Sequence, residues 1–264
     1  MESIFQAAGV TDSQQRVMKA VSVLEGGFDS VNTYDTGYVS VGLLQFACLS
    51  KGSGSLGTVL LREKESDPQA FNQDFRQYGL DVTPTGSLVA LDIDSGTVLE
   101  GPAAARKIIS DKRLIAVFQH SGHKSRAFQV AQVSTAINQY YPGNDAIAVN
   151  VNGQVISGRV GDFVRSEAGM ATLMDRKVNT GNLGPLASVL SQVGSQCGCR
   201  DASDFASHER EIVSAMKYRK DYTQDPSLSQ PGGIGSRDAT KTYPSRHSSS
   251  RFGRSGGGYK KRRA

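Results

Sequence analysis

Hydrophobic positions near the start of the chain recur at helical spacing and then stop. The stripe, typical of the buried face of an amphipathic helix, consists of Val17, Val21 and Leu24, with Met18 and Ala20 beside them. Thr11-Asp12 followed by Gln15 has the pattern of a capping box. Gly26-Gly27 supplies the backbone freedom that ends a helix. The pattern predicts a helix whose last turn carries Glu25.

The rest of the chain alternates between helical stripes and short hairpin patterns. A polar hairpin with Asp35 at its bend is expected next, followed by a new helix from Leu43-Leu44-Gln45. Further helices are expected over residues 55–64, 68–78, 102–118, 125–141, 163–178 and 202–222, and hairpins over 87–100 and 146–160. The pattern predicts an α+β fold that is mostly α-helical.

Composition changes near residue 223. Residues 232–264 contain nine Lys or Arg, one Asp, seven Gly and six Ser, with almost nothing to bury. That segment carries +8, so residues 1–231 carry −3, since the whole chain carries +5. We therefore expect a folded domain over 1–222 and a disordered basic tail over 223–264. Such a tail could bind polyanions, namely wall polymers, nucleic acid or anionic lipid, or a delivery or assembly partner.

Bulk properties narrow the class of protein. The chain has no apolar run near the roughly 20 residues that a membrane span requires. Its first residues lack the basic start and apolar core of a signal peptide. Synthesis in the cytoplasm is expected, with any action at a cell wall dependent on delivery by another route. The three cysteines do not form a disulfide framework.

Two short motifs could suggest a metal, but neither is complete in the sequence. Cys197-Gly198-Cys199 has no second pair with which to form a zinc site, so an inert loop is favoured. His120-Ser121-Gly122-His123 has no carboxylate cluster near it, and we expect it in a polar loop between helices. No metal ligand is assigned from the sequence.

Glu25 is the strongest candidate for chemistry. A carboxylate in the last turn of a helix faces the partial negative charge of exposed carbonyls, which disfavours the anion by up to ~1 kcal/mol. Burial beside Leu24 and Phe28 would favour the protonated carboxyl further. A general acid that protonates a leaving oxygen needs this property. The alternative is an ordinary solvated glutamate at a helix end.

The segment from Glu25-Gly26 through Tyr34-Asp35-Thr36-Gly37 to Ser40-Val41-Gly42 resembles the phage-type lysozymes. Their signature is a Glu-Gly helix end, a Tyr/Asp-Thr-Gly hairpin and a Thr-Ile-Gly step. The continuation to Leu43-Leu44-Gln45 is similar to the Gly-Leu-Met-Gln element of soluble lytic transglycosylases. Both resemblances imply the lysozyme-like superfamily, which also includes chitosanase-like muramidases.

The resemblance implies a site and an activity. Glu25 would be the general acid, Asp35 the second carboxylate, and Ser40 would replace the Thr that helps hold the attacking water. Tyr34, Gln45 and Asn179 would contact substrate. The implied activity is cleavage of β-1,4 bonds in peptidoglycan, a muramidase reaction that needs no cofactor. Two alternatives stay open: a one-carboxylate lytic transglycosylase, and a non-catalytic binding module whose tail engages nucleic acid or a partner.

Overall fold

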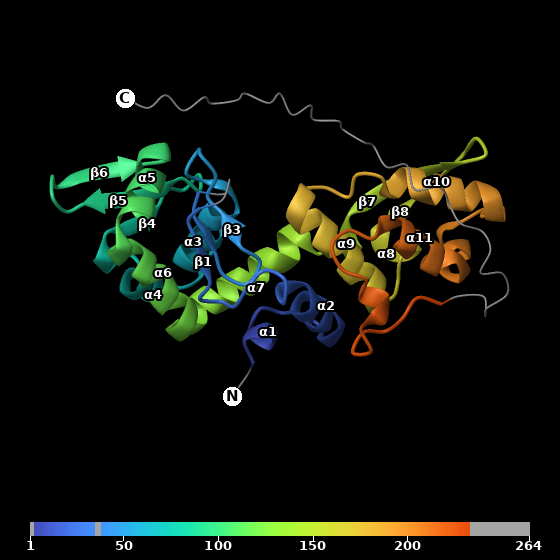
Figure 1. Cartoon of the computed structure of the whole chain (residues 1–264), viewed down its shortest axis with the longest axis horizontal. Helices are drawn as coiled ribbons and strands as arrows, with labels where there is room; N and C mark the ends of the chain where they lie inside the picture. The colour runs from blue at the N-terminus through green and yellow to red at the C-terminus, as the bar shows by residue number, and fades with distance from the viewer. Residues whose placement is uncertain (1–2, 35–37, 233–264) are drawn as a thin grey trace, which may run out of the picture. The chain divides into compact units, whose positions relative to one another are not determined.

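The computed structural model describes residues 3–34 and 38–232. It confirms an α+β fold that is mainly helical, with three small antiparallel sheets among these residues (Figure 1). Asp35, the expected bend of the first hairpin, lies outside the described residues. No helix in the described part is both long and apolar enough to cross a membrane.

Two short helices open the fold, α1 (Ile4–Ala7) and α2 (Asp12–Ser22). The capping box of α2 uses Thr11 and Gln14 rather than Asp12 and Gln15, because Gln14 is the residue that reaches the third position of the helix. The predicted apolar stripe is buried except for Leu24, which is 41% exposed. The helix ends at Ser22, so Leu24 has already left its buried face.

The first sheet is built from three strands of two residues each: β1 (Val31–Asn32), β2 (Ser40–Val41) and β3 (Phe46–Ala47). Its order is β1-β2-β3, with Asn32 opposite Ser40 and Ser40 opposite Ala47. The helix expected from Leu43-Leu44-Gln45 is absent from the described structure, which has a turn there leading into β3. Gln45 has a φ of 52°, a left-handed conformation that an α-helix does not allow.

The middle of the chain forms a helical region with its own sheet. Its elements are α3 (Gly54–Ser66), α4 (Pro68–Asp74), η1 (Arg76–Tyr78), β4 (Leu80–Val82), β5 (Leu88–Asp92), β6 (Thr97–Glu100), α5 (Pro102–Ser110) and α6 (Lys112–Lys124). The expected hairpin over 87–100 is present, and β4 adds a third strand to it. The expected loop around His120 and His123 is wrong, because both residues lie inside α6.

Helix α7 (Arg126–Tyr140) packs against α3, α4 and α6 of this region, and also against α1 and α9 (Figure 1). Phe75 is central to the packing: its ring lies 5.5 Å from Phe71, 5.5 Å from Phe118 and 4.9 Å from Phe128, centre to centre. These four buried rings join α4, α6 and α7 and their flanks into one core. Helix α7 is thereby fixed relative to the middle region.

The remaining elements form the C-terminal part of the described fold. They are η2 (Pro142–Asn144), β7 (Ala146–Val151), β8 (Gln154–Arg159), α8 (Val160–Phe163), α9 (Glu167–Thr180), α10 (Leu186–Cys197), η3 (Ala202–His208), α11 (Glu209–Met216) and η4 (Tyr222–Gln224). Asn152 and Gly153 have the positive φ values expected of a two-residue hairpin turn.

Packing continues past the boundary expected after Tyr222. Leu228 is only 4% exposed, and the Ser229 backbone N–H donates to Glu167 on α9 at 2.9 Å. The Ser229 carbonyl in turn accepts from the Ala168 backbone N–H at 3.1 Å. A boundary based on composition missed this segment because its few apolar residues form no periodic stripe.

Candidate active site

Glu25 follows the end of α2 in a turn, where its backbone N–H donates to the carbonyl of Ser22 at 2.9 Å. Its side chain is 11% exposed and forms an ion pair with Arg219. The side-chain amide of Asn179 approaches the same carboxylate oxygen at 3.5 Å. Glu25 is thus held by two side chains that lie more than 150 positions away in the sequence, while part of it still faces solvent.

Arg219 is shared between two carboxylates. Besides Glu25, its guanidinium pairs with Asp175 on α9, with the Arg219 Nε 2.9 Å from the Asp175 Oδ1. Asp175 is 1% exposed at its side chain and also accepts from Asn179 at 3.3 Å. Burial lowers the pKa of Arg219 but the bonds to Asp175 and Glu25 outweigh it, so its pKa is raised overall. The cluster of Glu25, Asp175, Asn179 and Arg219 is called the acid cluster below.

Helix α9 is the element that brings these residues together. It packs against both α2 and α11. At its first turn, the buried carboxylate of Glu209 accepts from the Ser166 N–H at 2.8 Å and from the Ser166 hydroxyl at 2.6 Å. Glu209 is the first residue of α11, so this contact fixes α11 to the start of α9. Arg219 lies a few residues beyond α11, so the same contact brings it next to Asp175, two turns along α9.

The first sheet is anchored by one buried amide. Gln132 on α7 is fully buried, accepts from the Leu43 N–H at 2.9 Å and donates to the Phe28 carbonyl at 3.0 Å. Gly42 has a φ of 82°, and a side-chain carbon added there would lie 2.0 Å from the Gln132 Oε1. Gln132 therefore fixes both ends of the segment that carries the hairpin, and it needs glycine at position 42 to reach them.

A hollow of about 320 Å³ lies beside the acid cluster: none of the four cluster residues lines it, but Val178, the neighbour of Asn179 on α9, does. Its lining includes Gln45, Ser55, Tyr140 and Val178. Burial raises the pKa of Tyr140, a hydrogen bond with Ser55 opposes this, and the negative charge of Glu25 raises it further. Tyr140 therefore lies close enough to Glu25 to feel its charge, and remains a neutral hydrogen-bonding phenol. Polar groups and apolar walls that converge beside a carboxyl are typical of a ligand site.

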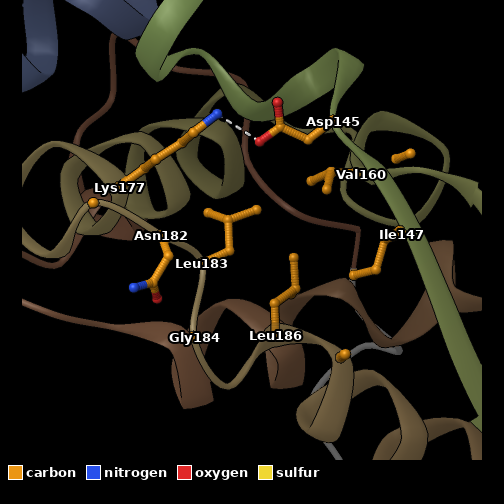
Figure 2. Close-up of a pocket in the computed structure, with 11 residues that line it drawn as sticks. Asp145, Ile147, Val160, Lys177, Asn182, Leu183, Gly184 and Leu186 are labelled. Atoms are coloured by element: carbon orange, nitrogen blue, oxygen red, sulfur yellow. Dashed lines mark hydrogen bonds and ion pairs between the residues drawn. The ribbon is translucent and has the colours of Figure 1, made fainter.

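A second hollow, of about 370 Å³, lies on the other side of Lys177 and is shown in Figure 2. Its walls are mainly apolar, with Ile147, Val160, Leu183 and Leu186 among the lining residues. The two titratable groups that line it, Lys177 and Asp145, are paired with each other at 2.6 Å. Because neither group is free for acid–base chemistry, the hollow beside Glu25 is the better candidate active site.

The structure brings some of the site residues predicted from the sequence close to Glu25 and not others. Asn179 contacts Glu25, and Gln45 lies at the adjoining hollow, where a side-chain carbon added to Gly26 would be 3.6 Å from its amide nitrogen. Tyr34 is 89% exposed and Ser40 is buried in β2. The described structure contains no hydrogen bond from either residue to Glu25. Asp35 lies outside the described residues, so its role stays a prediction.

Sequence reasoning missed Arg219. Arg219 stands among other basic residues in Lys217-Tyr218-Arg219-Lys220, and nothing local separates it from a solvated surface arginine. It also missed Tyr222, whose hydroxyl is buried and has no hydrogen-bond partner among the described residues. Burial, followed by the charge of Asp175, raises the pKa of Tyr222. The acid cluster is thus joined through contacts that no spacing rule reveals.

Comparison of the chain with protein-family models, with curated proteins and with solved structures finds no match in any of the three, so its function is argued from the site itself.

Proposed function

We propose that the protein cleaves β-1,4 glycosidic bonds of peptidoglycan, with Glu25 as the general acid. The observation that carries the proposal is the placement of Glu25: a partly exposed carboxyl, held by Arg219 and Asn179, whose charge acts on Tyr140 in the wall of a neighbouring hollow. A glycan ring offers hydroxyl groups and an apolar face, and Gln45, Tyr140 and Val178 match these. The lysozyme-like fold is part of the same proposal.

In the proposed reaction, Glu25 donates its proton to the glycosidic oxygen as the bond from that oxygen to the anomeric carbon breaks. The departing sugar leaves with a new hydroxyl, and a water molecule adds to the anomeric carbon. Asp35, with Ser40, would position that water or stabilise the developing positive charge. Glu25 must be protonated to act, whereas its ion pair with Arg219 requires the anion. When substrate binds and Glu25 is protonated, Arg219 therefore loses its ion pair with Glu25 and keeps only its bonds to Asp175.

A lytic transglycosylase is the second candidate, because Glu25 is the only carboxyl of the acid cluster that can reach a substrate. Of the two carboxylates in the acid cluster, Asp175 is almost completely buried and occupied by Arg219, so it cannot face a substrate. The described site therefore holds one available carboxyl. In a transglycosylase that single group suffices, because the 6-hydroxyl of the sugar attacks its own anomeric carbon and leaves an anhydro end in place of a reducing end.

The Glu25→Gln variant tests the acid role. Glutamine keeps the size of the side chain and can still bond to its neighbours, but it has no proton to release to a leaving oxygen. We expect peptidoglycan cleavage, measured by zymogram and by release of soluble fragments, to fall by about 10²–10⁴-fold. The free energy of unfolding should change by no more than about 1 kcal/mol, because Arg219 keeps its bonds to Asp175.

Glu65→Gln is the matched control, because Glu65 is an exposed glutamate on α3 that lines neither hollow. It should leave cleavage unchanged. Normal digestion by the Glu25→Gln variant would exclude the acid role and support a non-catalytic binding module. Asp35→Asn separates the two enzymes: it should be damaging in a two-carboxylate hydrolase and mild in a transglycosylase, whose products end in anhydro sugars.

A further inference from the structure

The C-terminal part of the fold brings together three side chains that ligate metals in other proteins. Cys197 is the last residue of α10, His208 is the last residue of η3, and Glu211 lies in the first turn of α11. One ligand atom from each, a sulfur, a ring nitrogen and a carboxylate oxygen, lies within 4.8 Å of the other two. The sequence pattern around Cys197-Gly198-Cys199 could not show this, because the other two ligands come later in the chain, from η3 and α11.

The distance between the sulfur and the ring nitrogen matches the coordination shell of zinc. The Cys197 Sγ and the His208 Nδ1 are 3.3 Å apart. Two ligands bound to one zinc ion at about 2.3 Å for sulfur and about 2.0–2.1 Å for nitrogen, in tetrahedral arrangement, are separated by a similar distance. His208 and Glu211 are three residues apart at a helix start, so their side chains fall on one face. Thiolate, imidazole and carboxylate together are ligands that zinc accepts readily.

A simple hydrogen bond between Cys197 and His208 does not explain the third residue. Glu211 is exposed and makes no salt bridge among the described residues, yet its carboxylate lies beside the thiol. A cation placed between the Cys197 sulfur and the Glu211 carboxylate would bind both groups, which lie side by side.

We propose that Cys197, His208 and Glu211 bind one zinc ion that links the end of α10 to the start of α11. Binding displaces the thiol proton of Cys197 to solvent, and the three side chains leave a fourth position for a water molecule. The ion would tie together two helices that already pack against each other. This inference is independent of the proposed glycan cleavage, because none of the three residues belongs to the acid cluster or lines the hollow beside it.

Cobalt binding to the full chain tests the site, because Co²⁺ takes zinc positions and a thiolate ligand gives it a charge-transfer absorption band. We expect one equivalent of Co²⁺ to produce the band, and Zn²⁺ to abolish it by displacement. The band should be lost in Cys197→Ser, and binding should weaken at least tenfold in His208→Gln and in Glu211→Gln. Zinc should also raise the melting temperature of the unsubstituted chain. It should not raise that of the variant that combines Cys197→Ser, His208→Gln and Glu211→Gln.

Matched controls use residues of the same types outside the site. His123→Gln, in α6, should bind cobalt normally, and Cys199→Ser should keep the band. The three site variants should fold, since Cys197 and Glu211 are exposed and His208 is partly exposed. Cys199 is buried, and serine is close to cysteine in size; circular dichroism and melting without metal check the folding of every variant. The proposal is overturned if the unsubstituted chain gives no thiolate band, or if the band persists in Cys197→Ser.

Discussion

Two pairs of carboxyl groups in this protein are buried in different ways. In the acid cluster, Asp175 and Glu25 share the guanidinium of Arg219. In the middle region, Glu63 on α3 is completely buried near Asp74 at the end of α4, and neither the Glu63 oxygens nor the Asp74 Oδ2 has a hydrogen-bond donor among the described residues. The first pair is neutralised by a cation and the second has to be neutralised by a proton.

The protonation state of the Glu63–Asp74 pair follows from its lack of a cation. Burial raises the pKa of Glu63 to about 9, and a hydrogen bond to Asp74 contributes to the rise. A proton on Glu63 supplies the donor that the pair lacks, so the pair is satisfied only while one carboxyl is neutral. Burial of carboxyls is therefore not by itself a sign of an active site. The acid cluster differs in that it lies beside a hollow and keeps one carboxyl within reach of solvent.

The largest expected effect comes from removing the shared cation. Arg219→Met leaves the Asp175 carboxylate buried without its charge partner, which typically costs about 3–5 kcal/mol of unfolding free energy. Urea unfolding at pH 7 measures this. The double variant Arg219→Met/Asp175→Asn removes both charges and should recover most of the loss. Equal destabilisation in the single and double variants would mean that Arg219 contributes packing rather than charge.

Glu63→Gln should raise the free energy of unfolding, whereas Arg219→Met should lower it. As pH rises, the unfolded chain ionises Glu63 near 4.5 while the folded chain holds the proton until about 9. The stability contributed by the protonated pair is therefore full below pH 4.5 and is lost as pH rises toward 9. Glutamine keeps a donor to Asp74 and cannot ionise. We expect the variant to be more stable than the unsubstituted chain by about 1–3 kcal/mol at pH 8, with little difference at pH 4.

Urea unfolding across pH 4–9 measures this difference, and Glu65→Gln on the same helix is the control, since that residue is exposed. A stability difference that stays constant with pH would show that Glu63 does not carry the proton. In that case, the contrast between a cation-neutralised and a proton-neutralised pair would fail.

A fifth carboxyl, paired with an exposed cation, extends the comparison. Glu167 on α9 pairs with Arg16 on α2 at 2.6 Å, and this bond, with that of the Ser229 N–H, lowers the pKa of Glu167 to about 2. Its stabilisation is present above pH 4.5 and is lost as pH falls toward 2. The Arg16 side chain is half exposed, so Arg16→Met should destabilise the fold less at pH 7 than Arg219→Met does.

The stability lost in Arg16→Met should be smaller in high salt. The stability lost in Arg219→Met should persist, because a buried charge is screened less. Unfolding free energies at low and high salt distinguish the two. A salt-independent effect of Arg16→Met would mean that its alkyl chain, rather than its charge, stabilises the junction between α2 and α9.

Local patterns in the sequence predicted much of the secondary structure. Three features depend only on residues within a few positions of one another: the stop of η1 at Gly79, the turn at Asn152-Gly153 and the end of α7 before Pro142. The helix predicted at Leu43–Gln45 is wrong, because the Leu43 N–H donates to the distant Gln132 side chain and Gln45 has a left-handed backbone conformation. Tertiary contact overrides local propensity in such places.

The candidate site was predictable only in part for the same reason. Glu25 stands out in the sequence because it lies between an apolar helical stripe and Gly26-Gly27, which is a local signal, although α2 already ends at Ser22. Arg219 and Asp175 meet Glu25 only because Glu209 fixes α11 to α9, a contact between segments more than 40 residues apart. Glu63 carried no signal either: its position on a helical stripe is ordinary, and its lack of a donor follows from which neighbours happen to surround it.

The anchoring of the hairpin by Gln132 has a consequence for how this region can change over evolutionary time. Because the amide binds Phe28 and Leu43, the two ends of the segment are fixed to α7 whatever lies between β1 and β2. A change in the length of the stretch between Asn32 and Tyr38 is therefore expected to leave the pairing of Glu25 with Arg219 in place. Such a change would move Asp35 relative to Glu25, so the second carboxylate of the proposed reaction can vary in position while the acid stays where it is.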